Sequence, residues 1–177
     1  MDSEGQLHLK LIRLSSGTFS CAEIISVERF GFGTYQFEVT GPIGAIDANV
    51  VLGIFFYPSA DVGPDGTNEI DVEVARWGHA DGPQVHYTAW YRSRRGSRHQ
   101  PLRVSDNANQ ARFGIRWSPG SIQWTSTLRE AAEAHFEGDV ASQPQSLRLN
   151  LWLFRQPAPT DGREVEFVVK PLRVRQW

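Results

Sequence analysis

Short runs of alternating apolar and polar residues, separated by turn-forming residues, recur along the whole 177-residue chain. In the run 33–41, for example, Tyr35, Phe37 and Val39 alternate with polar or charged neighbours. A period of two with one apolar face is typical of a strand that packs one face on a core. The 16 Gly and 10 Pro lie between such runs, where turns are needed. The pattern therefore predicts an all-β protein.

The expected strands share this alternation and an excess of β-branched and aromatic residues. They cover 6–14, 20–28, 33–41, 48–57, 69–77, 84–91, 111–117, 121–128, 147–154 and 164–175. Only residues 129–137 favour a helix, through Ala and Glu. No repeat or linker-like shift in composition divides the chain, so we expect a single domain over residues 1–177. Strands with one apolar face need a second layer, which predicts a two-sheet antiparallel sandwich.

Composition and charge exclude several classes of protein. No run of 18 apolar residues exists, so we expect neither a membrane-spanning helix nor a membrane partner. A formal net charge of −2 is unlike that of proteins that bind nucleic acid through bulk charge. The single cysteine, Cys21, excludes a disulfide within the chain and a cysteine-based zinc site. The opening residues MDSEGQLHLKL lack the features of a signal peptide.

Three carboxylates occupy every second position of one expected strand. On a strand, Glu69, Asp71 and Glu73 share one face, and the apolar residues between them share the other. Like charges about 7 Å apart raise one another's pKa, so a strand face that only meets solvent gains nothing from this arrangement. On a curved sheet the two glutamates can lean toward each other until their carboxyl groups are about 5 Å apart. This is the spacing of nucleophile and general acid/base in a retaining glycosidase.

The central carboxylate, Asp71, could hydrogen-bond the nucleophile and keep the pKa values of the two glutamates apart. The same pattern also fits an ordinary exposed acidic strand, or a calcium site built from carboxylates. The three residues alone do not distinguish a pair of catalytic carboxylates from an acidic strand or a calcium site.

Several further motifs follow one another in a characteristic order. They are Cys21-Ala22-Glu23, Phe30-Gly31-Phe32-Gly33-Thr34-Tyr35, Gly53-Ile54-Phe55-Phe56-Tyr57, Glu69-Ile70-Asp71-Val72-Glu73, Gln84-Val85-His86-Tyr87, Phe113-Gly114-Ile115-Arg116-Trp117, Ile122-Gln123-Trp124 and Leu149-Asn150-Leu151-Trp152. With these motifs the sequence resembles glycoside hydrolase family 16, in particular its bacterial lichenase-like β-glucanase branch.

The resemblance implies a jelly-roll sandwich of the concanavalin A-like lectin/glucanase fold, with a cleft on its concave face. It implies Glu69 as nucleophile, Asp71 as its assistant and Glu73 as general acid/base. The expected activity is retaining endo-hydrolysis of a β-glycan, by a β-glucanase (β-1,3-1,4 or related), in a secreted or extracellular monomer. The expected partner is a polysaccharide or oligosaccharide substrate. No cofactor is expected to be required, although the resemblance allows a structural calcium ion.

By the same resemblance, Glu23, Asn150 and Trp152 match positions that contact sugar. Strand parity supports this, because the leucines of 147–154 share one face and leave Asn150 and Trp152 on the other. Parity in the strand after the carboxylates adds three candidates: His86, Thr88 and Trp90. Aromatic rings cover the apolar faces of sugars while polar groups read their hydroxyls. For Trp152, Trp90 and His86, plain packing is the alternative. Three other tryptophans are expected to be structural: Trp77, Trp117 and Trp124.

The chain also departs from the lichenase branch at sugar-binding positions. Ile25 replaces an Arg, Thr67 a Trp and Thr88 an Asn, so lichenan is not carried over as the substrate. These changes keep two alternatives open, a non-catalytic carbohydrate-binding jelly roll and a transglycosylase that uses the same site. The segment 92–99, with four Arg and one His, fits either a solvated hairpin tip or a clamp for an anionic ligand.

Overall fold

The computed structural model describes residues 1–128, 134–155 and 157–177. Within these ranges the chain forms thirteen strands and no helix. The strands are β1 (Leu7–Arg13), β2 (Phe19–Ser20), β3 (Ala22–Phe30), β4 (Gly33–Thr40), β5 (Val50–Tyr57), β6 (Ile70–Ala75), β7 (Val85–Trp90), β8 (Ser97–Leu102), β9 (Gln110–Ser118), β10 (Ser121–Ser126), β11 (Ala134–Glu137), β12 (Gln145–Leu153) and β13 (Val165–Gln176).

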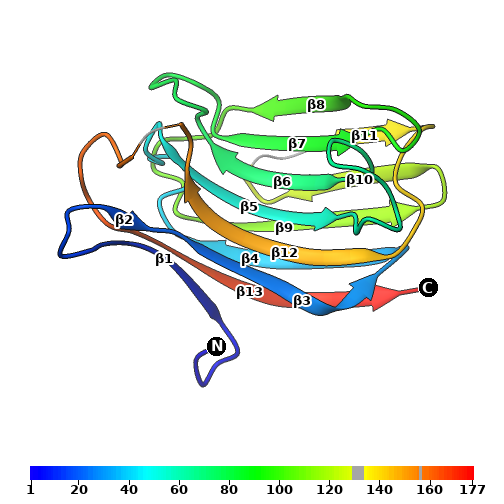
Figure 1. Ribbon diagram of the computed structural model, residues 1–177, viewed down its shortest axis with the longest axis horizontal. Coiled ribbons are helices and arrows are strands. Elements are labelled where there is room, and N and C mark those ends of the chain that lie inside the picture. Colours follow the sequence, from blue (N-terminus) through cyan, green and yellow to red (C-terminus); the bar gives the residue numbers. More distant parts are fainter. Residues whose placement is uncertain (129–133, 156) are drawn as a thin grey trace.

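The strands form two antiparallel sheets. One has six strands in the order β3-β12-β5-β6-β7-β8, and the other has seven in the order β11-β10-β9-β4-β13-β1-β2. Figure 1 looks onto the six-stranded sheet, behind which β9, β4 and β10 of the other sheet run. The predicted all-β, two-sheet antiparallel sandwich is therefore confirmed.

The core lies between the two sheets and follows the predicted alternation. In β4, Tyr35, Phe37 and Val39 are fully buried, while the residues between them are partly exposed. Trp117 and Trp124 are also fully buried, which confirms their predicted structural role. Each sheet covers the apolar face of the other, as the alternating pattern requires.

The helix predicted for 129–137 is wrong where the structure describes it. Residues 129–133 lie outside the described ranges, and 134–137 form strand β11 instead. β11 pairs with β10, with Phe136 opposite Ile122, and the Phe136 ring lies 5.2 Å from the Trp124 ring. Pairing with a sheet edge and packing on a core tryptophan override the weak helix propensity of Ala and Glu in so short a segment.

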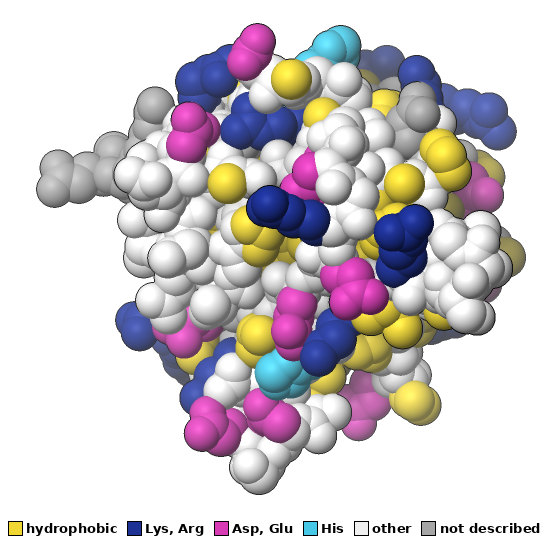
Figure 2. Space-filling view, turned by 90° about the vertical axis from the view of Figure 1, so that its left-hand side faces the viewer, with side chains coloured by type: hydrophobic (Ala, Val, Ile, Leu, Met, Phe, Trp, Pro, Cys, Tyr) yellow, Lys and Arg dark blue, Asp and Glu magenta, His cyan; other side chains and the backbone are white. Residues whose placement is uncertain are grey.

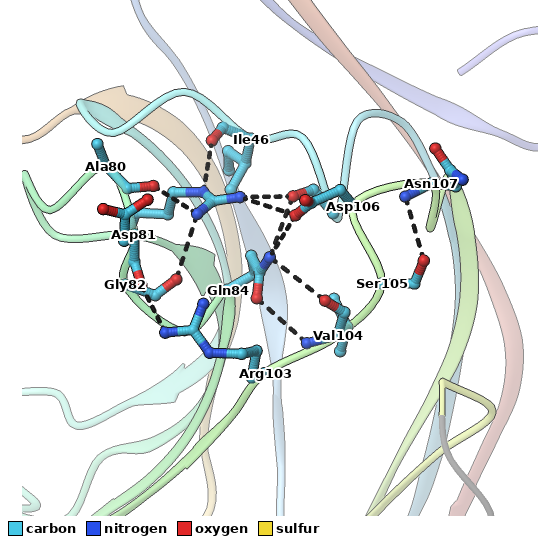
Figure 3. Close-up of polar contacts among 12 residues, drawn as sticks. Ile46, Ala80, Asp81, Gly82, Gln84, Arg103, Val104, Ser105, Asp106 and Asn107 are labelled. Carbon is cyan, nitrogen blue, oxygen red and sulfur yellow. Dashed lines mark hydrogen bonds and ion pairs between the residues drawn. The ribbon is translucent and has the colours of Figure 1, made fainter.

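Buried polar contacts fix the end of the six-stranded sheet where β6 leads into β7 (Figure 3). The Arg76 guanidinium donates to the Gly44 carbonyl at 2.8 Å and to the Ala80 carbonyl at 2.6 Å. The buried Gln84 amide donates to the Gly44 carbonyl at 3.2 Å and accepts from the Val104 N–H at 3.1 Å. These bonds satisfy the carbonyl of the buried Gly44 and connect three loops, and so hold the ends of β6 and β7 in place.

Charged side chains of both signs surround small, separate hydrophobic patches on the face shown in Figure 2. None of the described residues belongs to a helix that is long and apolar enough to cross a membrane. The same residues contain no group of three or more His, Cys, Asp or Glu side chains arranged to hold a metal ion.

Candidate active site

Strand β6 presents the three carboxylates on the outer face of the six-stranded sheet. Its core-facing residues are at most 1% exposed: Ile70, Val72 and Val74. Glu69 immediately precedes the strand, and Asp71 and Glu73 lie within it on the opposite face. β6 is flanked by β5 and β7, so hydrogen bonds on both sides hold its backbone in place. The predicted sharing of one face by the three acids is thus realised at the centre of a sheet.

A turn with one residue in the left-handed region places Glu69 at the start of β6. Asn68 has a φ of 61°, in the left-handed region that asparagine tolerates better than most residues. Its N–H donates to the Tyr91 carbonyl at 3.1 Å, and its carbonyl accepts from the buried Gln145 amide at 2.7 Å. The Glu69 carbonyl in turn accepts from the Trp90 N–H at 2.9 Å. Sequence reasoning missed Asn68 and Gln145, since nothing in the alternating pattern marks a left-handed turn.

Asp71 is 3% exposed and held on both sides. The Trp90 indole N–H donates to its Oδ2 at 3.1 Å. Oδ1 is buried and has no ordinary donor within the described residues, but the Asp71 and Glu69 carboxyl groups share a hydrogen bond. Burial, followed by the negative charges of Glu69 and Glu73, raises the pKa of Asp71 well above its usual value. The hydrogen bond between the two groups also raises the pKa of Asp71 and lowers that of Glu69, which favours Asp71 as the proton donor.

The two glutamates are also shifted upward, to different extents. Burial raises the pKa of Glu69 to about 7, although the hydrogen bond with Asp71 and the positive charge of Arg148 act in the opposite direction. Burial and the negative charge of Glu69 raise the pKa of Glu73 to about 8. Asp71 and Arg148 thus favour the ionised form of Glu69, whereas both causes at Glu73 favour its protonated form. Such a pair can hold one carboxylate and one carboxylic acid at the same pH, which is what nucleophile and general acid require.

Strand register places Glu23, Asn150, Gly53 and Glu73 in one row across β3, β12, β5 and β6. A Cβ at Gly53 would lie 2.6 Å from the Asn150 Oδ1, so only glycine leaves that amide room beside Glu73. The Asn150 Oδ1 is buried and has no hydrogen-bond partner among the described residues. An unpaired buried acceptor is costly, and a sugar hydroxyl would satisfy it.

Arg148 reaches the carboxylates from the same face of β12. Its Nη1 lies 3.9 Å from the Glu23 Oε1, and its guanidinium carbon lies 4.4 Å from the centre of the Tyr57 ring. The Tyr57 hydroxyl donates to Asp65 at 2.7 Å, which together with burial raises the pKa of Tyr57 to about 12. Parity placed Arg148 on this face, but its sequence position gave no sign of its proximity to Glu69.

An aromatic cluster lies along the same face. The Trp152 ring centre lies 6.3 Å from Trp77 and 6.2 Å from Phe154, and Trp77 lies 5.1 Å from Phe154. The Arg155 guanidinium lies 4.7 Å above the Phe154 ring. All three rings are partly exposed, so the cluster combines packing with an accessible aromatic surface. Trp77 was expected to be structural. Its rings pack against Trp152 and Phe154, on the outer face of the sheet and not in the main core.

Two of the three candidates on β7, His86 and Thr88, are buried. His86 is 3% exposed, and its Nε2 lies 3.0 Å from the Ala75 carbonyl and 3.1 Å from the Pro83 carbonyl. Its Nδ1 lies 2.8 Å from the His99 Nε2. With both nitrogens engaged, His86 supports β7 instead of presenting a hydrogen-bonding atom to a sugar.

Thr88 and Trp90, the other two candidates on β7, differ in what they contact. Thr88 is 7% exposed and lies opposite Asp71 in the register. Trp90 is partly exposed, and its indole N–H donates a hydrogen bond to Asp71. Trp90 thus contacts the candidate site through this bond, and its exposed ring surface offers a second contact for a ligand.

Ion-pair, hydrogen-bond and cation–π contacts hold the Arg-rich segment 92–99 in place. Arg92 lies 3.8 Å from Asp139, the Arg98 guanidinium donates to the Glu137 carbonyl at 2.7 Å, and Arg94 stacks over Tyr91 at 3.9 Å. Strand β8 begins at Ser97, so the second half of this segment is sheet and not a hairpin tip.

The amino-acid sequence matches the profile of Glycosyl hydrolases family 16 over residues 1–168. The β-glucanase of Bacillus licheniformis is 28% identical over 159 residues, which cover 86% of this chain and 59% of that protein. The β-glucanase of Bacillus subtilis (strain 168) is 27% identical over 159 residues, which cover 86% of this chain and 60% of its own. The chain therefore spans about 60% of the length of the curated relatives it matches.

Solved structures show the same fold. The Bacillus licheniformis β-glucanase superposes with a TM-score of 0.70 at 22% identity, over 98% of this chain and 81% of its own. A Bacteroides ovatus mixed linkage glucan GH16 protein, in complex with a G4G4G3G product, superposes with a TM-score of 0.71 at 15% identity, over 97% of this chain and 83% of its own. The sandwich is thus the jelly roll of these enzymes, and the chain belongs to glycosyl hydrolase family 16.

Proposed function

We propose that this protein is a retaining endo-β-glucan hydrolase that acts on β-1,3-1,4 or related linkages. The observation that carries the proposal is the central strand β6, on which Asp71 hydrogen-bonds Glu69 while burial raises the pKa of both Glu69 and Glu73. An acidic strand that only faced solvent would keep ordinary pKa values. The family match and the relatives named β-glucanase support the choice of substrate.

In the first step, the ionised Glu69 attacks the anomeric carbon of the sugar. The bond between that carbon and the glycosidic oxygen breaks as Glu73 gives its proton to the departing oxygen. Against the upward effect of burial, the hydrogen bond from Asp71 and the positive charge of Arg148 lower the pKa of Glu69, which supports Glu69 as the ionised member of the pair. The hydrogen bond from Asp71 orients the Glu69 carboxylate during the attack.

In the second step, the Glu73 carboxylate removes a proton from a water molecule. The water oxygen attacks the anomeric carbon, and the ester bond to Glu69 breaks, which regenerates both glutamates. Two inversions at one carbon give net retention of configuration. If a sugar hydroxyl took the place of water, the same residues would carry out transglycosylation.

Sugar binding is assigned to the row that contains Glu73 and to the aromatic cluster. Asn150 and Glu23 offer hydrogen bonds to hydroxyls next to the scissile bond, since Asn150 is partly exposed and Glu23 is exposed. Trp152 offers a partly exposed ring for the apolar face of a sugar.

The first test of this proposal is the Glu69→Gln variant, measured by release of reducing ends from a panel of β-glucans. We expect the rate to fall by at least about a thousandfold, because the amide cannot form the covalent intermediate. The matched control is Glu164→Gln, which changes an exposed glutamate away from the site. Equal rates for Glu69→Gln and the unmodified protein would disprove the assignment of the nucleophile.

Chemical rescue tests the retaining mechanism itself. In Glu69→Ala, added azide would occupy the space of the missing carboxylate and attack from the same side, giving a glycosyl azide of inverted configuration. In Glu73→Ala, azide would intercept the intermediate on Glu69 and give an azide of retained configuration. Binding of glucans without turnover by the unmodified protein on any polymer would instead identify a non-catalytic binding module.

A further inference from the structure

The outer face of the seven-stranded sheet lies on the far side of the sandwich from the carboxylates. Four strands of this sheet lie side by side in the order β10, β9, β4 and β13. Their core-facing residues are at most 1% exposed: Tyr35, Phe37, Phe113, Ile115, Ile122 and Trp124. The residues between these point outward, away from the core and away from the candidate active site.

Register aligns these outward residues in two adjacent rows. The first row is Arg175, Thr34, Arg116 and Gln123. The second row is Arg173, Gln36, Gly114 and Thr125. Rows two residues apart along a strand are separated by about 7 Å. We call these two rows, together with Trp177 after the end of β13, the arginine groove.

The groove is a depression in the sheet surface, and Gly114 lies in its floor. Gly114 adds no side chain there, and the Thr125 Oγ1 lies where its Cβ would point, at 2.4 Å. A hollow of about 380 Å³ lies over both rows and reaches Trp177. A second hollow of about 270 Å³ shares Gln36, Gly114 and Thr125 with it and extends to Arg112.

Positive charge gathers in this groove although the whole chain carries a net charge of −2. Arg112, at its edge, is paired with Glu38 at 3.1 Å. Within the described ranges, Arg116, Arg173 and Arg175 make no ion pair, and the Arg116 guanidinium lies 5.9 Å from the centre of the Trp177 ring. Trp177 is 58% exposed. Arg173 and Arg175 lie two positions apart on β13, and only Thr34 separates Arg175 from Arg116 in the register. These like charges on one face repel one another, and an anionic ligand would remove that cost.

We propose that the arginine groove is a second binding site, which binds an acidic polysaccharide that carries carboxylate or sulfate groups. Guanidinium groups pair with such anions through two parallel hydrogen bonds. Gln36, Thr34 and Thr125 add neutral donors and acceptors for hydroxyls, and Trp177 offers one ring for the apolar face of a sugar. A polynucleotide fits less well, because it would need several stacking rings and a more basic surface.

The test is the double variant Arg173→Gln/Arg175→Gln, titrated at low salt with polygalacturonate, with dextran sulfate and with a neutral β-glucan. We expect the Kd for at least one acidic polymer to rise by about tenfold or more, since two charge-assisted contacts are lost. The control Arg13→Gln/Arg163→Gln removes the same charge from exposed positions outside the groove and should change this Kd by less than about twofold. Arg116→Gln provides a second variant within the groove.

Binding to this groove must also be independent of the active site. Glu69→Gln should bind the acidic polymer as the unmodified protein does, so that failure of the proposed hydrolysis would leave this result standing. Three outcomes would overturn the proposal: no binding of either acidic polymer, equal losses in the groove variant and its charge control, or tighter binding of poly(U) than of both acidic polymers. Circular dichroism would confirm that each variant is folded.

Discussion

At the scale of single residues, Asp71 determines how the site ionises. It is buried between two glutamates, with one oxygen bonded to the Trp90 indole and the other facing Glu69. Two carboxylates cannot share a hydrogen bond unless one of them holds a proton. Because the shared hydrogen bond raises the pKa of Asp71 and lowers that of Glu69, we assign the proton to Asp71. In this assignment Asp71 is a neutral donor that holds the ionised Glu69, the proposed nucleophile.

This assignment predicts that Asp71→Asn keeps much of the activity, whereas Asp71→Leu does not. The Asn amide can donate to Glu69 and its carbonyl can accept from Trp90, so we expect kcat to fall by less than about tenfold. Leu removes both bonds and should lower kcat by at least about a hundredfold. The measurement is kcat on the best β-glucan of the panel, with thermal unfolding as a check of stability. Equal losses in the two variants would mean that the charge of Asp71, and not its proton, is what Glu69 requires.

At the scale of elements, three neighbouring strands form the site, and the middle strand has a glycine where the outer two have Asn150 and Glu73. Gly53 of β5 lies between Asn150 of β12 and Glu73 of β6 in the register. The absent Cβ lets the Asn150 amide lie over β5, next to Glu73, the proposed general acid. Glycine normally weakens a strand interior, so its position at the centre of a fully paired sheet has a spatial reason.

Gly53→Ala should therefore harm substrate binding more than folding. The new Cβ would lie 2.6 Å from the Asn150 Oδ1 and 3.2 Å from the Phe55 ring, so the amide must move away from Glu73. We expect KM to rise by about three- to tenfold and the free energy of unfolding to fall by about 1 kcal/mol. Gly31→Ala is the matched control, because its Cβ would meet no atom closer than 3.5 Å. An unchanged KM in Gly53→Ala would show that Asn150 does not bind sugar next to Glu73.

At the scale of the whole molecule, the protein is less stable because it holds acidic side chains on the outer face of its six-stranded sheet. Glu73 has a pKa of about 8 in the folded protein and an ordinary value of 4.5 when exposed. Between these values the folded protein binds more protons than the unfolded chain, so stability falls as the pH rises through this window. The loss is complete above about pH 8, when a buried carboxylate must be kept ionised beside Glu69.

Glu73→Gln should consequently stabilise the protein at alkaline pH, because the amide has no proton to lose. We expect its advantage over the unmodified protein to grow from pH 5 to pH 9 and to reach at least about 1 kcal/mol, or about 2–4 °C in Tm. Thermal unfolding across this range measures the difference, and Glu164→Gln should show none. A difference that is the same at both pH values would mean that Glu73 does not titrate as a buried acid.

Much of this protein follows from its sequence alone. Alternation with a period of two predicted the fold class and the faces of most strands, including the shared face of Glu69, Asp71 and Glu73. The period is a local property, fixed by neighbouring residues, so it can be read without knowing which strands meet. Residue propensity, in contrast, gave a wrong prediction at residues 134–137, where a weak helix preference lost to pairing with β10.

The tertiary structure alone decided which faces meet and how deeply each group is buried. It brought Arg148 near Glu69, engaged both nitrogens of His86, and aligned arginines of β9 and β13 into one groove. Strand order joins segments more than a hundred residues apart in the chain, and no local pattern records it. The pKa values follow from the same cause, since burial is a property of the assembled sheets and not of any single strand.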